Sequence, residues 1–157
     1  MSSADISHIL LTESDKIKCK VSSTLNKSAE YASKHMFDGT DVTCWNSDQG
    51  SPQFVFLDLC RFVKPTKIVL QFQGGFVCEN CQIETGMEMK VLRSDVDPIH
   101  PDNSNAVQEF VLTTGGGTDS LGSCRYFKII FPESLDFFGR VTIYKLQLYG
   151  EVVDETQ

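Results

Sequence analysis

The fold is decided by residues 29–59, which read AEYASKHMFDGTDVTCWNSDQGSPQFVFLDL. The stretch begins as a helix-like segment, passes through a tight loop, and ends in a run of alternating apolar residues that is typical of a strand. Ser28 precedes it, and a serine in that position can accept hydrogen bonds from the first free amides of a short helix. Gly39 can adopt the positive φ of a C-terminal turn, so we predict one short helix that ends before it.

The loop around Gly39 is dense in side-chain oxygens, which come from Asp38, Thr40, Asp41 and Thr43. A turn this tight also directs several carbonyls inward, and that is how a hard cation is bound. The same side chains can instead accept hydrogen bonds from the amides of the turn. Trp45, the only tryptophan, follows the loop and is predicted to be a core residue that fixes the loop to the sheet.

Size and charge limit the classes of function. The chain has 157 residues, 41% of them hydrophobic, and a formal net charge of −7. We therefore expect one domain over residues 15–152, with a loosely held lead-in at 1–14 and a tail at 153–157. The acidic balance argues against nucleic acid and anionic membranes as partners. The apolar run near the N-terminus is too short for a signal peptide, so we expect the nucleus or the cytoplasm as the location.

Six cysteines could form an even set of disulfides, but without a secretory signal they are expected to be reduced. Cys44 and Cys60 lie in apolar stretches and are predicted to be core residues. Cys78 and Cys81 form half of a zinc motif, which would need Cys124 or a distant histidine to complete it. We predict instead that both are solvent-facing thiols in a loop.

Alternation of apolar and polar residues predicts strands throughout the rest of the chain, at 17–21, 53–59, 65–74, 87–92, 107–113, 124–131 and 140–149. Residues 76–86 are predicted to be a loop. In the last strand the alternation changes phase near Tyr144, as a β-bulge would cause. No helix connects successive strands, so the fold class is all-β, an antiparallel sandwich of the jelly-roll kind.

Three predicted loops at strand ends carry the candidate partner-binding residues: Asn46, Asp48, Gln49, Gln73, Phe76, Asp136, Phe137, Phe138 and Arg140. Adjacent phenylalanines beside an arginine are typical of an interface anchor, because aromatic residues and Arg dominate binding energy. The alternative is structural. Arg140 would then pair with Asp136 or Asp48 and hold the loops together, while one phenylalanine fills the end of the sandwich.

Several segments together resemble the discoidin, or coagulation-factor type C, domain, a galactose-binding-like jelly roll: residues 37–39 with Thr43 and Trp45, then 53–59, then 148–151. Residues 44–50, 71–76 and 136–141 are more specifically similar to the orphan nuclear receptor associated protein family. That resemblance implies a small nuclear regulator that acts on an orphan receptor through protein–protein contact.

Relatives of the discoidin fold often hold a structural calcium. The resemblance implies the ligands Phe37 and Thr40 or Asp41 through carbonyls, Asp38 through its carboxylate, Thr43 through oxygen atoms, and Glu151 from the last strand. An ion at this position would join the two ends of the chain. The hydrogen-bonded turn described above remains the alternative.

The sequence points to binding rather than catalysis. It contains no nucleophile elbow, no phosphate-binding loop and no His-Glu-x-x-His motif, so we do not expect an enzyme. We expect a protein-binding module, by resemblance one that binds a nuclear receptor. The alternatives are a lectin-like module that binds a glycan, and a structural subunit of a large assembly such as a ciliary one.

Overall fold

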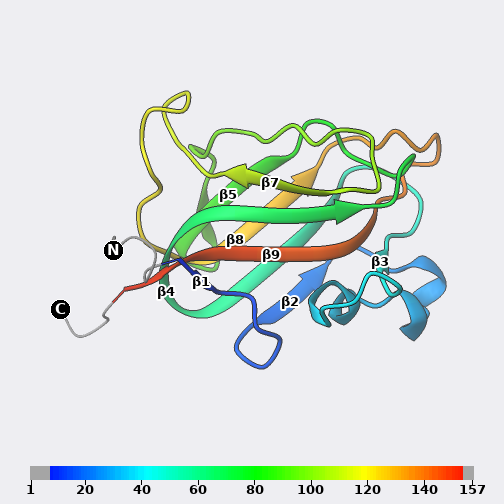
Figure 1. Ribbon diagram of the computed structural model, residues 1–157, viewed down its shortest axis with the longest axis horizontal. Coiled ribbons are helices and arrows are strands. Elements are labelled where there is room, and N and C mark those ends of the chain that lie inside the picture. The colour runs from blue at the N-terminus through cyan, green and yellow to red at the C-terminus, as the bar shows by residue number, and fades with distance from the viewer. Residues whose placement is uncertain (1–7, 154–157) are drawn as a thin grey trace.

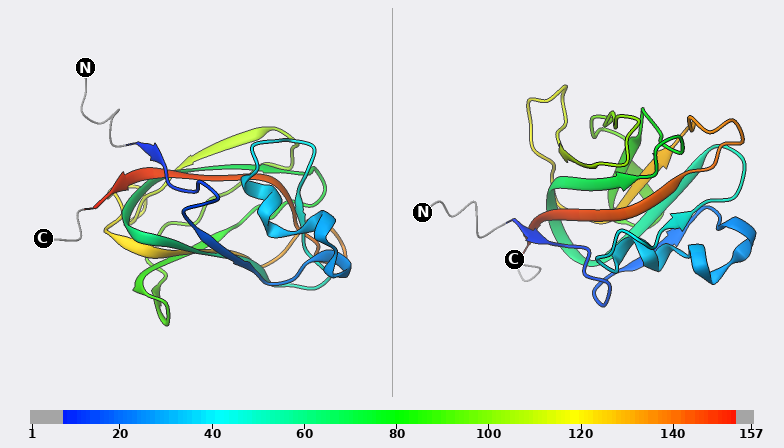
Figure 2. Two further views of the ribbon diagram at one scale, coloured as in Figure 1. Left: turned by 90° about the horizontal axis from the view of Figure 1, so that it is seen from below. Right: turned by 45° about the vertical axis from the view of Figure 1, so that its right-hand side comes forward.

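The computed structural model describes residues 8–153 and contains a nine-stranded antiparallel sheet that folds over into two layers (Figure 1, Figure 2). The strands are β1 Ile9–Leu10, β2 Lys18–Val21, β3 Trp45–Asn46, β4 Gln53–Phe72, β5 Gln82–Glu88, β6 Val91–Arg93, β7 Val107–Val111, β8 Cys124–Phe131 and β9 Thr142–Val152. The predicted all-β antiparallel fold is confirmed. No helix in the described residues is long and apolar enough to cross a membrane.

Strand β4 belongs to both layers. Residues 53–58 pair with β8 and, in part, with β2, whereas residues 63–72 pair with β9 and, in part, with β7. The two strands predicted at 53–59 and 65–74 are therefore one strand that bends. At the bend Cys60 has a φ of +59°, and the Asp58 carboxylate accepts hydrogen bonds from the Cys60 amide at 2.8 Å and from Arg125 Nε at 2.9 Å. Cys60 is exposed rather than a core residue, because the bend turns it outward.

The core lies between the layers and includes Trp45, as predicted. Its side chain is completely buried, its ring centroid lies 6.3 Å from that of Phe131, and its indole nitrogen donates to the Ser23 carbonyl at 3.0 Å. Burial of side chains of this size stabilises the fold by roughly 2–3 kcal/mol each. The tryptophan therefore fixes the loop before β4 to the rest of the sandwich.

The predicted bulge in the last strand is also confirmed. Gln71 pairs with Lys145 and Phe72 pairs with Ile143, so Tyr144 is the extra residue on β9. Ile143, which precedes Tyr144, and Leu146 and Leu148, which follow it, are all completely buried. The bulge lets β9 keep its apolar residues toward the core on both sides of the phase change.

The predicted helix is three short 3₁₀ turns instead, η1 Leu25–Lys27, η2 Ala29–Tyr31 and η3 Ser33–Phe37. Ser28 does cap one of them, by accepting a hydrogen bond from the Glu30 amide at 3.2 Å. Both Ser28 and Ala32 have extended backbone angles, which interrupt a continuous helix. A helix this short is marginal by itself, so the burial of Met36 against the sheet decides the path of the chain.

Two other boundaries differ from the prediction. Part of the predicted lead-in is structured, because β1 pairs with β9 and Leu11 is completely buried; residues 1–7 and 154–157 lie outside the described residues. Part of the predicted loop at 76–86 is β5, which pairs with β8 and places Ile83 in the core. The strand predicted at 87–92 is the end of β5, a turn at 89–90 and the start of β6, and Met87, Met89 and Val91 are exposed.

Candidate binding surface at one end of the sandwich

Three loops that are far apart in the sequence meet at the right-hand end of Figure 1, and we call them the rim surface: residues 46–50, 73–76 and 136–140. The Gly50 amide donates to the Phe138 carbonyl at 2.8 Å, which joins the first loop to the third. The Thr142 amide donates to the Phe76 carbonyl at 3.3 Å, which joins the second loop to the start of β9. The structure therefore brings the predicted loops together.

The first loop is held by two buried polar side chains. Ser47 exchanges hydrogen bonds with Val141: its amide donates to the Val141 carbonyl at 2.9 Å, and its hydroxyl accepts from the Val141 amide at 2.8 Å. Gln53 donates from Nε2 to the carbonyls of Gly50 at 2.8 Å and Asp48 at 3.2 Å. This role of Gln53 was not predicted, although a glutamine at the start of an apolar strand is a visible signal in the sequence.

Phe137 and Phe138 project from the third loop into solvent. Phe137 is 92% exposed and Phe138 is 52% exposed. Their rings meet edge to face, with centroids 5.2 Å apart and an interplanar angle of 89°. This is a favourable geometry for an aromatic pair, so the two rings form one raised apolar feature. Neither ring fills the end of the sandwich.

Arg140 is fixed beneath these rings. Its guanidinium donates to both carboxylate oxygens of Asp136, from Nε at 2.9 Å and from Nη2 at 3.2 Å. The same guanidinium lies 5.2 Å from the ring centroid of Phe76 and 5.7 Å from that of Phe138, within range of cation–π contact. Hydrogen bonds from Arg140 lower the pKa of Asp136, and the same bonds raise the pKa of Arg140. The predicted pairing with Asp136 is thus present in the structure.

The remaining predicted residues border the rings with polar groups. Asp48 and Gln49 are exposed, and the Asp48 carboxylate accepts from the Gln49 amide at 2.9 Å. Gln73 Oε1 accepts from the Tyr144 hydroxyl at 3.5 Å. The side-chain oxygen of Asn46 is buried, and no hydrogen-bond partner for it lies within the described part of the chain.

The acidic turn before Trp45 is internally hydrogen-bonded. The Asp38 carboxylate accepts from the Thr40 amide at 3.0 Å, from the Thr40 hydroxyl at 3.1 Å and from the Thr43 hydroxyl. His35 Nδ1 lies 3.5 Å from the same carboxylate. Gly39 adopts a φ of +78°, as predicted for the residue that ends the helical segment. Both oxygens of Asp38 are therefore occupied within the turn.

A calcium ion at this turn would compete with these hydrogen bonds for the Asp38 carboxylate. Phe37 and Asp38 line a cavity of about 320 Å³ together with Lys145 and Gln147 of β9. Glu151 lies four residues beyond Gln147 along β9, roughly 13 Å away at the rise of an extended strand. Within residues 8–153, no group of three or more His, Cys, Asp or Glu side chains is arranged to hold a metal ion.

The Cys-x-x-Cys segment also differs from the prediction. Cys78 is 2% exposed and Cys81 is completely buried, so these are not solvent-facing thiols. The Cys81 amide donates to the Ile99 carbonyl at 2.9 Å and the Ile99 amide donates back at 3.1 Å. This exchange holds the start of β5 inside the molecule.

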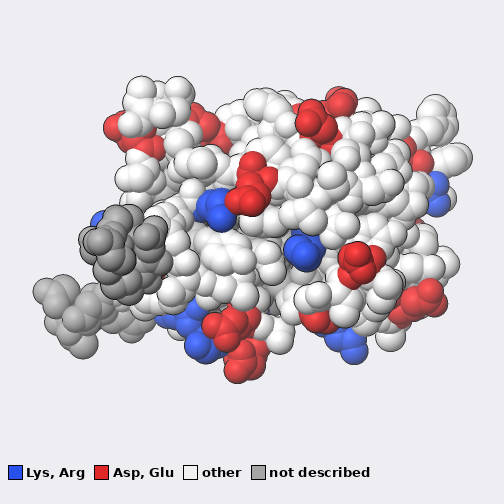
Figure 3. Space-filling model, viewed as in Figure 1, with Lys and Arg blue, Asp and Glu red and all other residues white. Residues whose placement is uncertain are grey.

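Charged side chains do not gather on the face seen in Figure 3, where Lys and Arg lie interspersed with Asp and Glu. One of the pairs on the sheet is Lys67 Nζ with Glu109 Oε1 at 2.9 Å, across the β4–β7 pairing. The exposed phenylalanines, rather than a field of one charge, therefore distinguish the rim surface.

Solved structures with the same fold include carbohydrate-binding proteins. The C-terminal domain of a chitobiase from Bacteroides fragilis matches with a TM-score of 0.74 and 19% identity, covering 93% of this chain and 100% of that one. The family 32 carbohydrate-binding module of NanJ from Clostridium perfringens, in complex with galactose, matches with a TM-score of 0.71 and 17% identity, over 90% and 98% of the two chains. At these identities the likeness establishes the galactose-binding-like fold alone.

Sequence comparison gives nearer relatives, although no protein-family model matches the chain. Nuclear receptor 2C2-associated protein from Mus musculus is 41% identical over 133 residues, which is 84% of this chain and 89% of that protein. The proteins of the same name from Danio rerio and Homo sapiens are 38% and 37% identical, over 84% and 85% of this chain and 89% and 91% of theirs. The chain therefore belongs to the nuclear receptor 2C2-associated protein family.

Proposed function

We propose that this chain is a non-catalytic protein-binding module, that it captures its partner through the rim surface, and that it acts in the nucleus or the cytoplasm. The names of its relatives make nuclear receptor 2C2 the partner to test. The observation that carries the proposal is the 92% exposure of Phe137 beside a second exposed phenylalanine. Two aromatic rings exposed to water are unfavourable, and burying them in a partner's pocket would lower the free energy.

The anchors of the rim surface are ordered before any partner arrives. Arg140 is held by two hydrogen bonds to Asp136 and packs between two aromatic rings. Binding therefore has little side-chain entropy to remove at this residue, and pre-ordering of this kind increases affinity. Aromatic residues and arginine are also the types that dominate the energies of protein interfaces.

The rim surface lacks the chemistry of an active site. Its best-placed carboxylate, Asp136, has a pKa below the ordinary value because Arg140 donates to it, so it would be a poor general acid or base at neutral pH. Asp48 is exposed. These features support recognition rather than catalysis.

The test is a titration of purified nuclear receptor 2C2 with the full chain and with Phe137→Ser. Because Phe137 is almost fully exposed, the substitution should leave the melting temperature unchanged while affinity falls by about tenfold or more, as expected for an interface hot spot. Val42→Ser is the matched control, since Val42 is 82% exposed and lies outside the rim surface. Equal affinity for Phe137→Ser and the unmodified chain would refute the role of this surface.

Glycan binding is a second candidate, favoured by one feature of the same surface. The rim surface combines an exposed aromatic ring with the amide side chains of Gln49 and Gln73, and a sugar site needs an aromatic platform together with polar groups. Titration with galactose would detect it. Saturable binding that Phe137→Ser abolishes, together with no binding to the receptor, would replace the first proposal with this one.

A further inference from the structure

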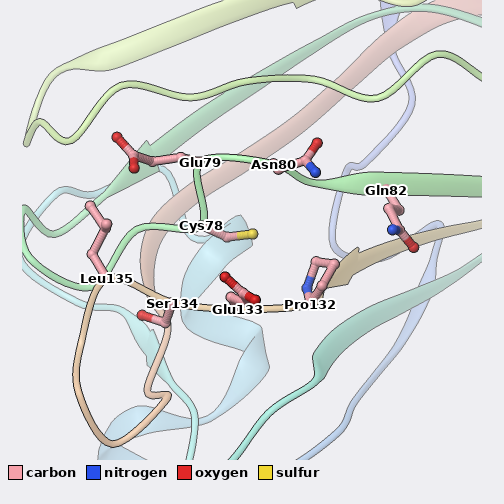
Figure 4. A pocket seen from close by; sticks show the side chains of 8 residues that line it. All are labelled: Cys78, Glu79, Asn80, Gln82, Pro132, Glu133, Ser134 and Leu135. Atoms are coloured by element: carbon pink, nitrogen blue, oxygen red, sulfur yellow. The ribbon is translucent and has the colours of Figure 1, made fainter.

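Cys78 and Cys81 lie in the loop before β5, and Cys78 lines a cavity outside the rim surface. Figure 4 shows the Cys78 sulfur pointing into this cavity, above Glu133 and toward Pro132. The cavity has a volume of about 240 Å³, and Glu79 also lines it. Cys81 is completely buried and does not line the cavity. One thiol therefore faces the cavity, and the other is enclosed by the protein.

The two cysteines are joined by a hydrogen bond, and their thiols differ in acidity. Cys81 Sγ donates to the Cys78 carbonyl at 3.4 Å. The same S–H can donate instead to the Cys78 sulfur, which lowers the pKa of Cys78 to about 7, whereas burial raises the pKa of Cys81 well above the ordinary value. At neutral pH a substantial fraction of Cys78 is thus thiolate, while Cys81 keeps its proton. Attacking and resolving thiols in redox-sensing proteins differ in this same way.

We propose that Cys78 and Cys81 form an oxidisable dithiol site, in which a small peroxide oxidises Cys78 and Cys81 then closes an intramolecular disulfide. In the first step the Cys78 thiolate attacks one oxygen of hydrogen peroxide, the O–O bond breaks, and hydroxide leaves, which gives a sulfenic acid. In the second step the Cys81 sulfur attacks the Cys78 sulfur and the S–O bond breaks. The departing hydroxide takes the Cys81 proton and leaves as water. The hydroxide released in the first step takes up the proton that Cys78 lost on ionisation and becomes the second water. Overall, two thiols and one peroxide yield one disulfide and two waters.

The cavity selects the oxidant. With only 2% of Cys78 exposed, the sulfur can be reached by a molecule near the size of water but not by a bulky disulfide. Glu79 and Glu133 add negative charge to the cavity lining, which further disfavours anionic reagents such as glutathione disulfide. Cys60 provides the internal comparison, because it is exposed and needs no cavity for access.

The experiment treats the reduced, folded chain with hydrogen peroxide at neutral pH and follows tryptic peptides by mass spectrometry. Residues 68–90 form one tryptic peptide whose only cysteines are Cys78 and Cys81. The expected result is a loss of two hydrogen atoms from this peptide, reversed by dithiothreitol, at or below the peroxide dose that modifies Cys60. Glutathione disulfide should leave the peptide unchanged.

Two variants separate the steps. In Cys81→Ser the disulfide cannot form, so Cys78 sulfenic acid should accumulate, and dimedone should trap it when the oxidised chain is unfolded in its presence. Cys124→Ser is the matched control, because Cys124 is another buried thiol and its loss should leave the disulfide intact. Persistence of both free thiols at doses that oxidise Cys60, or a disulfide that appears only after unfolding in urea, would overturn the proposal. A mixed disulfide with glutathione at Cys78 would overturn the selection of small oxidants.

Discussion

Gly139 lies against Gly50 so closely that a Cβ atom on Gly139 would be 2.7 Å from the Gly50 carbonyl oxygen. Gly139 also has a φ of +84°, a conformation that residues with side chains rarely adopt. The Phe-Phe-Gly-Arg turn can therefore press onto the first loop only because this position lacks a side chain. The close approach of Gly139 to Gly50 therefore positions Phe138 and Arg140 on the rim surface.

Gly139→Ala should consequently destabilise the protein. Backbone strain alone costs roughly 1–3 kcal/mol, and the collision with the Gly50 carbonyl adds to it. Denaturant unfolding measures the loss. Gly116→Ala is the control, since Gly116 has a φ of +74° but a Cβ atom there would have no neighbour within 4 Å. Equal losses for the two variants would mean that the contact with Gly50 contributes nothing.

Asp58 should make the stability of the bend depend on pH. Hydrogen bonds from Arg125 lower the pKa of Asp58 in the folded state below the ordinary value of 3.8. The ionised carboxylate thus contributes stability that is fully present above about pH 5 and is lost as pH falls through the folded-state pKa. In urea unfolding, the advantage of the unmodified chain over Asp58→Asn should be constant at neutral pH and shrink below about pH 4. An advantage that does not shrink below about pH 4, down to the lowest pH at which both chains still fold, would contradict this assignment.

Calcium should not change the stability of the chain, because both Asp38 oxygens already accept hydrogen bonds and the Lys145 side chain lines the neighbouring cavity. The measurement is the melting temperature in a chelator, followed by excess calcium. Magnesium serves as the control for ionic strength. A melting temperature that rises with calcium alone and saturates would restore the metal site that the family resemblance implies.

Cys81→Ala should raise the pKa of Cys78 above its value of about 7, because the variant removes the hydrogen bond that stabilises the thiolate. The pH profile of hydrogen peroxide oxidation at Cys78, followed as loss of the free thiol, reports this pKa. Cys81→Ser keeps a donor and should leave the profile closer to that of the unmodified chain. A profile that Cys81→Ala does not move would show that another group sets the acidity of Cys78.

Features set by local pattern were predictable from the sequence. Alternation located β8 at its observed bounds, the phase change located the bulge at Tyr144, and the single tryptophan was correctly placed in the core. Each of these depends on which face of a strand is apolar, and the sequence displays that directly.

Features set by tertiary contact were not predictable. The two halves of β4 were predicted as separate strands because residues 60–64 break the alternation of apolar and polar residues. In the structure, backbone pairing continues around the bend. The burial of Cys78 and Cys81 depends on β5 pairing with β8, in a segment with too few apolar residues to be recognised as a strand.

The candidate site was predicted in part, for the same physical reason. Loops at strand ends were expected to meet, and the pairing of Arg140 with Asp136 was one of the two predicted alternatives. The stacking of Arg140 on Phe76 joins two loops that are distant in the sequence, and no local pattern reports it. The placement of Lys145 and Gln147, rather than Glu151, on the cavity that Asp38 lines likewise depends on tertiary contact, which only the structure provides.

The bend in β4 has a consequence for how this protein can be divided. The first half of β4 pairs with β8 in one layer, and the second half pairs with β9 in the other. A cut at Cys60 would therefore give two fragments, and each would lack strands that its own part of the sheet pairs with. Neither fragment could close its core alone, so the halves would regain structure only by recombining with each other.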